Sequence, residues 1–168
     1  MYIYAMKITI LICLLFITTA KLSHGTTRRI QSKNYFTSID TSLYYIVKYN
    51  NYMEEYSFHK KVIPADLSND EIIKIEKLID ERVSAYNQVE SKQKSPSLIE
   101  HPEKYYKQIV AVTNSNNEKE VWINCFCFVK KDWKRGLRMV SDGGHCYFKL
   151  KINLTKKAVY DFYVNSII

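Results

Sequence analysis

The C-terminal part of the chain alternates apolar and polar residues over four runs, a pattern typical of antiparallel strands with one buried face. The predicted strands are Tyr105–Thr113, Val121–Val129, His145–Thr155 and Ala158–Ser166. A turn at residues 155–157 would place apolar residues opposite one another in the last hairpin. The expected pairs are Leu154 with Ala158, Ile152 with Tyr160 and Leu150 with Phe162. The pattern therefore constrains the chain to a sheet that covers a core.

A single amphipathic helix precedes these strands. Ser68 and Glu71 form a capping box, in which each side chain can bond the backbone of the other, so the helix should begin there and end near Val89. Its expected buried face is Ile72, Ile75, Ile79, Val83 and Tyr86. Upstream, Tyr56–Ile63 is rich in β-branched and aromatic residues and predicts a strand that Pro64 ends.

This order predicts an α+β fold with one helix packed on an antiparallel sheet of four to five strands. A strand, one helix and then four strands is the cystatin-like order. Gln108–Val112 is similar to the Gln-x-Val-x-Gly hairpin of cystatin inhibitors, but it lacks the glycine and lies within a predicted strand, so protease inhibition is not expected. We predict a signal peptide at residues 1–25, an unassigned segment at 26–54 and a single domain at 55–168.

The signal peptide is predicted from Lys7 and the apolar run Ile8–Ile17, which closes on small residues. Cleavage after Gly25 is expected, with Ala20 as the alternative, and Met6 is an alternative start. A run of this length is short of the roughly 20 residues that a membrane span needs. We therefore expect an exported protein, periplasmic or secreted, with no transmembrane segment after cleavage.

The net positive charge of the chain favours some classes of binding partner over others. Removing Lys7 and Lys21 from 25 basic residues leaves 23 against 17 acidic ones, a charge of +6. Outside the cytoplasm this charge favours an anionic envelope component or another protein over nucleic acid. The alternative is that the charge serves solubility alone.

Three cysteines remain after export: Cys125, Cys127 and Cys146. Alternation places all three on core-facing positions, and an oxidising compartment favours one disulfide with one spare thiol. Cys146 is the shared partner, so the pair is Cys127 with Cys146 or Cys125 with Cys146. The alternative is three buried thiols. The spacing does not suit zinc, and no metal or cofactor is expected.

Asp142 and His145 lie next to Cys146 and suggest nucleophilic catalysis. His145 and Cys146 are neighbours on a predicted strand, however, so their side chains should point to opposite faces. Gly143 and Gly144 are explained by a turn into that strand. We therefore predict no catalytic residue here.

The sheet face away from the cysteines carries aromatic and basic residues, which together suit stacking and anion binding. The candidate ligand-binding residues are Trp122, Asn124, Phe126, Phe128, Tyr147, Lys149 and Lys151, with Trp133, Lys134, Arg135 and Arg138 in the following loop. The alternative is that a second layer, such as residues 35–52, covers these aromatic side chains.

Several segments of the chain resemble a family of small uncharacterised bacterial proteins, many of them exported. The resemblance covers about Tyr56 to Val164, and the segments that carry it are Pro64–Ser68, Tyr105–Gln108, Glu120–Cys127, Asp142–Phe148 and Lys151–Thr155. It implies one intact domain and bacterial export, and it implies no activity.

These observations together favour a non-enzymatic exported domain that binds a ligand or protein through the aromatic and basic sheet face. One alternative is a small extracytoplasmic enzyme that uses Asp142, His145 or a free thiol. Another is a structural, envelope-associated protein.

Overall fold

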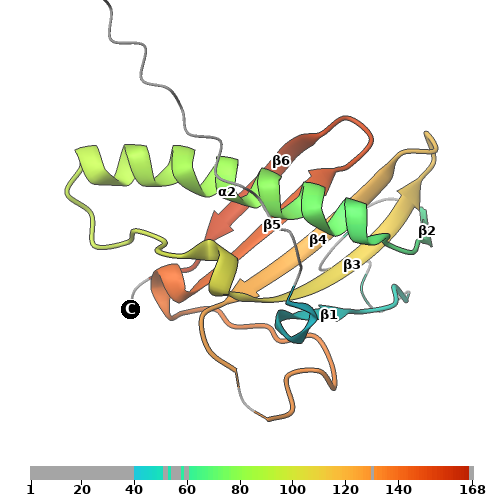
Figure 1. The fold of residues 1–168 in the computed structure, drawn as a ribbon, viewed down its shortest axis with the longest axis horizontal. Helices are drawn as coiled ribbons and strands as arrows, with labels where there is room; N and C mark the ends of the chain where they lie inside the picture. Colours follow the sequence, from blue (N-terminus) through green and yellow to red (C-terminus); the bar gives the residue numbers. More distant parts are fainter. Residues whose placement is uncertain (1–39, 51–52, 54–57, 59–60, 130, 167–168) are drawn as a thin grey trace, which may run out of the picture. The chain divides into compact units, whose positions relative to one another are not determined.

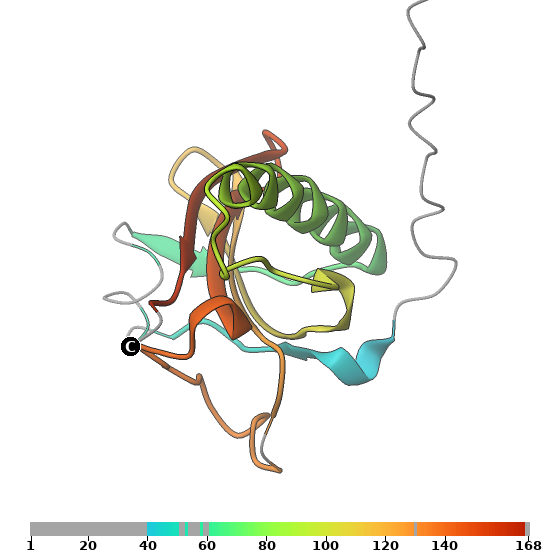
Figure 2. The same ribbon diagram turned by 90° about the vertical axis from the view of Figure 1, so that its left-hand side faces the viewer.

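One long helix lies across one face of a mixed β-sheet (Figures 1 and 2). The computed structural model describes residues 40–50, 53, 58, 61–129 and 131–166, which belong to one unit at residues 34–168. The predicted signal peptide lies outside the described residues. The elements are β1 (Tyr44–Ile46), β2 (Val62–Pro64), α2 (Asn69–Lys92), β3 (Tyr106–Asn114), β4 (Lys119–Phe126), β5 (Tyr147–Asn153) and β6 (Ala158–Val164), with 3-10 turns at Thr41–Leu43, Pro102–Lys104 and Gly144–Cys146. The predicted α+β class is confirmed.

The sheet is not wholly antiparallel, so that part of the fold prediction is wrong. Strands β3, β4, β5 and β6 form an antiparallel meander, whereas β1 pairs in parallel with β3, with Tyr44 opposite Lys107. Strand β2 pairs antiparallel with the far end of β3. A parallel pair needs a long connection, and the chain between β1 and β3 contains the whole helix. Because two strands precede α2, the cystatin-like order is not confirmed.

The first predicted strand is displaced along the chain. Strand β2 includes Pro64, the residue that was expected to end it, and Phe58 lies outside any strand. The rest of the predicted strand before residue 61 lies outside the described residues. Proline is tolerated in β2 because the strand is short and lies at the sheet edge.

The residues from Asp40 to Asn50 pack with the domain that was expected to begin at residue 55. Strand β1 bonds the edge of β3, and the Val47 amide donates to the Ile109 carbonyl at 2.8 Å. Tyr44 is buried against the helix side of the sheet. This segment is therefore part of the fold.

Helix α2 begins where the capping box predicts. The Glu71 amide donates to Ser68 Oγ at 3.3 Å, and the Ser68 amide donates to Glu71 Oε2 at 2.9 Å. The helix continues to Lys92, beyond the predicted end at Val89. Its apolar face packs on the sheet as expected, with Ile75, Ile79 and Val83 buried and Ile72 and Tyr86 partly buried. The sheet contributes Ile109, Ala111, Val121, Ile123, Cys125, Phe148, Leu150 and Ile152 to this core.

The β5–β6 hairpin differs from the predicted register near its turn. Leu150 faces Phe162 as expected, but Ile152 faces Val159 and Asn153 faces Ala158. The predicted pairs of Leu154 with Ala158 and Ile152 with Tyr160 are therefore wrong. The loop is one residue longer than predicted, with Lys157 in the left-handed region at φ 55°, and a bulge restores the register. Tyr160 is the extra residue of this bulge.

Candidate functional site

Much of the predicted aromatic face is covered, so the expectation of an open binding face is wrong for Trp122, Asn124 and Phe126. All three side chains are buried. Trp122 lies in a second core on the sheet face away from α2, where residues from the N-terminal segment cover it. That core contains Tyr49, Met53, Phe58, Val110, Val112 and Trp122. The alternative of a second layer over this face is therefore correct for these three residues.

The loop between β4 and β5 covers Asn124 and Phe126 on this face. Gln108 Nε2 donates to the carbonyls of Trp133 and Gly136, both at 2.7 Å. Asn124 Nδ2 donates to the Arg138 carbonyl at 2.7 Å, and the Arg138 amide donates to Gln108 Oε1 at 2.9 Å. Two buried amide side chains thus hold the loop onto the sheet. They have a structural role.

Trp133 is part of the same cover. Its ring packs edge-on against Phe126 with a centroid separation of 5.7 Å, and against Tyr106 and Tyr45. The Lys134 ammonium lies 5.0 Å from the Trp133 ring centroid. Of the predicted loop residues, Trp133 therefore contributes aromatic packing against Tyr45, Tyr106 and Phe126.

Four of the predicted ligand-binding residues reach the surface. Phe128 is exposed and packs edge-on against Tyr147, with ring centroids 5.8 Å apart. Lys149 is partly exposed, and burial lowers the pKa of its ammonium. Lys151 forms an ion pair with Asp161 at 3.7 Å. Phe128, Tyr147 and Lys149 therefore remain at least partly exposed, although Tyr147 and Lys149 lie opposite the buried Phe126 and Asn124 in the sheet.

Cys127 and Cys146 form a disulfide with Cα atoms 5.1 Å apart, which confirms the first of the two predicted pairings. Cys125 is a free thiol in the core, and burial raises its pKa. The prediction that all three cysteines face the core is wrong for Cys127, which is exposed because β4 ends at Phe126. Neither the disulfide nor the buried Cys125 thiol presents a thiolate nucleophile at the surface.

Asp142 and His145 are not brought together as an acid–base pair. Among the described residues no hydrogen bond or ion pair joins them, and His145 lies in a 3-10 turn and not in the predicted strand. Gly143 and Gly144 have positive φ angles of 87° and 56°, as a turn at this point requires. A Cβ atom on Gly143 would lie 2.6 Å from the Tyr147 ring. The two glycines are therefore explained by the backbone conformation of this turn.

A hollow lies elsewhere on the sheet face away from α2, between the β3–β4 and β5–β6 turns. We call it the hairpin groove; its volume is about 350 Å³. Sequence reasoning did not select it. It is lined by Phe58, Val62, Asn114, Asn116, Glu118, Glu120, Lys151, Asn153, Lys156, Ala158 and Tyr160.

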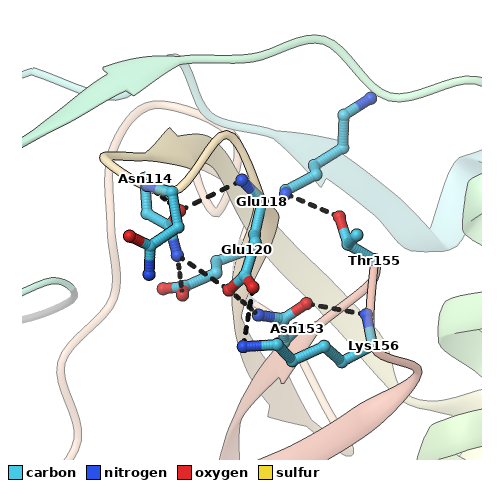
Figure 3. A network of polar contacts seen from close by, with 8 residues as sticks. Asn114, Glu118, Glu120, Asn153, Thr155 and Lys156 are labelled. Atoms are coloured by element: carbon cyan, nitrogen blue, oxygen red, sulfur yellow. Dashed lines mark hydrogen bonds and ion pairs between the residues drawn. The ribbon is translucent and has the colours of Figure 1, made fainter.

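A network of polar side chains forms one wall of the hairpin groove (Figure 3). Glu118 accepts from Lys156 Nζ at 2.6 Å, from Asn153 Nδ2 at 2.8 Å and from Asn114 Nδ2 at 3.3 Å. Asn114 Nδ2 also donates to Glu120 Oε1 at 2.6 Å. The backbone of the β3–β4 turn is part of this network, because the amides of residues 116 and 118 donate to Asn114 Oδ1. The wall is therefore fixed before any ligand enters.

Tyr160 lines the groove beside Glu120. The bulge in β6 places it on the groove face, whereas strict alternation predicted the core face. Its hydroxyl donates to Glu120 Oε2 at 3.1 Å, and 52% of the residue remains exposed. No sequence pattern reveals a bulge, so this residue could not be found from alternation.

The pH dependence of this wall follows from Glu118. Hydrogen bonds from Lys156, Asn153 and Asn114 hold the pKa of Glu118 below its ordinary value of 4.5. A depressed folded-state pKa contributes stability above the unfolded value, and that contribution is lost as pH falls through the folded value. We expect the stability difference between wild type and Glu118→Gln to shrink below about pH 4.5.

Thermal unfolding midpoints between about pH 3 and pH 7 measure this difference. Lys156→Met removes the strongest donor to Glu118, so the pKa of Glu118 is less depressed and the loss of stability in acid should be smaller than in wild type. Parallel profiles for wild type and Glu118→Gln would show that Glu118 has no depressed pKa.

Metal sites and membrane spans were sought in the same described residues. They contain no group of three or more His, Cys, Asp or Glu side chains placed to hold a metal ion. They also contain no helix long and apolar enough to cross a membrane.

The chain matches no family model, and neither the curated proteins nor the solved structures give a match.

Proposed function

We propose that this chain is an exported, non-enzymatic binding domain that holds a small ligand in the hairpin groove. The observation that carries the proposal is the combination in one hollow of a half-exposed ring, Tyr160, and a carboxylate with neutral partners, Glu120. Ligand sites are concave, with a few convergent polar groups among apolar ones. A volume of about 350 Å³ lies at the small end of the range for such sites.

Export rests on two observations of different kinds. The N-terminal apolar run predicts a signal peptide, and the Cys127–Cys146 disulfide is consistent with an oxidising compartment. The resemblance to small exported bacterial proteins points the same way. A cystatin-like relationship is a further proposal about the fold, but inhibition is not part of it, because Gln108 is buried beneath the β4–β5 loop.

A separate contact surface is proposed for the exposed remainder of the predicted face. Phe128, Tyr147 and Lys149 could meet an anionic envelope component or another protein, since the apolar rings and the ammonium group lie near one another in the β4–β5 region. The groove is favoured as the main site because it is concave and its walls are fixed.

The groove assignment is tested by nuclear magnetic resonance on the isotopically labelled chain. The probes are three mixtures of small molecules: neutral sugars, polyamines, and phosphate with citrate. We expect at least one mixture to shift the backbone amides of residues 116–120 and 156–160. Tyr160→Ala should abolish these shifts, because it removes the aromatic ring that lines the groove.

Tyr163→Ala is the matched control. Tyr163 lies on the same strand and is equally exposed at 52%, but it does not line the groove. Its substitution should leave the shifts unchanged. The proposal fails if no mixture shifts the groove amides, or if the two variants respond alike.

A further inference from the structure

The lining of the hairpin groove contains two glutamates and two lysines, so it carries no net charge, and Glu120 is the one of these four side chains whose hydrogen-bond partners are neutral. Glu118 forms an ion pair with Lys156 at 2.6 Å, and Lys151 forms one with Asp161 at 3.7 Å. An anionic ligand would meet the two glutamates and find both lysines engaged. A polyamine would meet both lysines. The balance therefore favours a ligand without net charge.

Glu120 leaves hydrogen-bond acceptor capacity open in the groove. The two oxygens of Glu120 accept from Asn114 Nδ2 and Tyr160 Oη, which are neutral donors. A carboxylate can accept about four hydrogen bonds, so roughly half of its capacity is open. The exposed amide of Asn116 lies on the same wall and can both donate and accept. Hydroxyl groups of a ligand match this set, because each hydroxyl donates and accepts.

The apolar part of the groove suits a flat face of carbon–hydrogen groups. Tyr160 presents a half-exposed ring, and Val62 and Ala158 lie on the same lining. The hydrogen bond from Tyr160 to Glu120 fixes the ring orientation before binding, which lowers the entropic cost of binding. A ligand with one apolar face and several hydroxyl groups would use both halves of the groove.

We propose, resting on the function proposed above, that the ligand of the hairpin groove is a neutral carbohydrate of about one or two sugar rings, a size set by the volume. The sugar packs a ring face on Tyr160 and donates hydroxyl hydrogen bonds to Glu120. Asn116 binds a further hydroxyl group at the β3–β4 turn.

Isothermal titration calorimetry on the purified chain tests this inference with named probes: maltose, cellobiose, diacetylchitobiose and methyl galactoside, with spermidine and inorganic phosphate as charged probes. We expect one or more of the sugars to bind and both charged probes to fail. Glu120→Gln should weaken sugar binding about tenfold or more, because the hydroxyl groups lose a charged acceptor.

Two further variants separate ligand contact from folding. Tyr160→Phe keeps the ring but loses its bond to Glu120, so it should weaken binding less than Tyr160→Ala does. Tyr163→Ala should bind as wild type does. Each variant is used only if its thermal unfolding midpoint shows that it folds.

The outcomes distinguish this inference from the function on which it rests. Binding of spermidine or phosphate in the groove, without any sugar, would overturn the carbohydrate class and keep the binding function. Sugar binding that Glu120→Gln and Tyr160→Ala leave unchanged would place the sugar elsewhere and overturn the inference. Failure of every probe to bind would overturn the carbohydrate inference, and failure of the groove amides to shift with any mixture would overturn the function as well.

Discussion

Replacing Lys107 with methionine should lower the free energy of unfolding by about 3–5 kcal/mol, because it leaves the carboxylate of Glu76 buried without its partner. Lys107 and Glu76 are 0% and 3% exposed, and their side chains form an ion pair at 3.2 Å between β3 and α2. Lys107 Nζ also donates to the carbonyls of Pro102 and Tyr105. Tyr44 lies beside both side chains. The pair therefore joins the helix, the sheet and the N-terminal segment.

The loss in Lys107→Met should depend on pH. Burial raises the pKa of Glu76 above its ordinary value of 4.5, even though Lys107 opposes the shift. Without Lys107 that pKa rises further, so the folded variant binds a proton that the unfolded chain releases. Stability of the variant therefore falls as pH increases above about 4.5. Urea unfolding at about pH 5 and pH 8 measures the difference.

Two further variants control this prediction. The double variant Glu76→Met with Lys107→Met should recover most of the loss, since two apolar side chains leave no buried charge. Lys77→Met removes a lysine whose ion pair with Glu81 is exposed, and should cost less than about 1 kcal/mol. A loss in Lys107→Met no larger than in Lys77→Met would contradict a structural role for the buried pair.

Local patterns in the sequence predicted the elements that local forces determine. The capping box at Ser68 located the start of α2 to the residue, because its two hydrogen bonds involve neighbours in the chain. Alternation predicted the four strands of the meander from β3 to β6 and the cross-strand pair of Leu150 with Phe162. These features need no information about distant parts of the chain.

Contacts between distant segments were not predictable in the same way. The parallel pairing of Tyr44 with Lys107 joins residues 63 positions apart, and no composition signal marks it. The burial of Trp122 depends on the N-terminal segment crossing the second sheet face. Alternation tells which residues share a face, and it does not tell whether that face is covered.

Two features of the hairpin groove could not be predicted from local sequence patterns. The first is the bulge at Tyr160. It follows from the length of the β5–β6 loop, which was predicted one residue too short. The polar wall of the groove brings Asn114 and Glu118 from one turn next to Asn153 and Lys156 from another. These side-chain bonds between the two turns could be seen only in the structure.

Replacing Trp122 with alanine should lower the free energy of unfolding by about 3–5 kcal/mol, the usual cost of emptying a buried aromatic site. Trp122 is 2% exposed and packs in the second core with Val110 and Val112 from β3 and Tyr49 from the N-terminal segment. The cavity would weaken the packing of Tyr49 and its neighbours on the sheet. Thermal or urea unfolding measures the loss.

Phe128→Ala is the matched control, because Phe128 was predicted for the same binding face but is 57% exposed. It should cost less than about 1 kcal/mol, since its side chain is largely solvated. If Trp122→Ala instead kept wild-type stability, the second core would not hold the N-terminal segment, and the aromatic face would again be open to ligands. The two substitutions thus separate aromatic residues that build the fold from those that remain free to meet a partner.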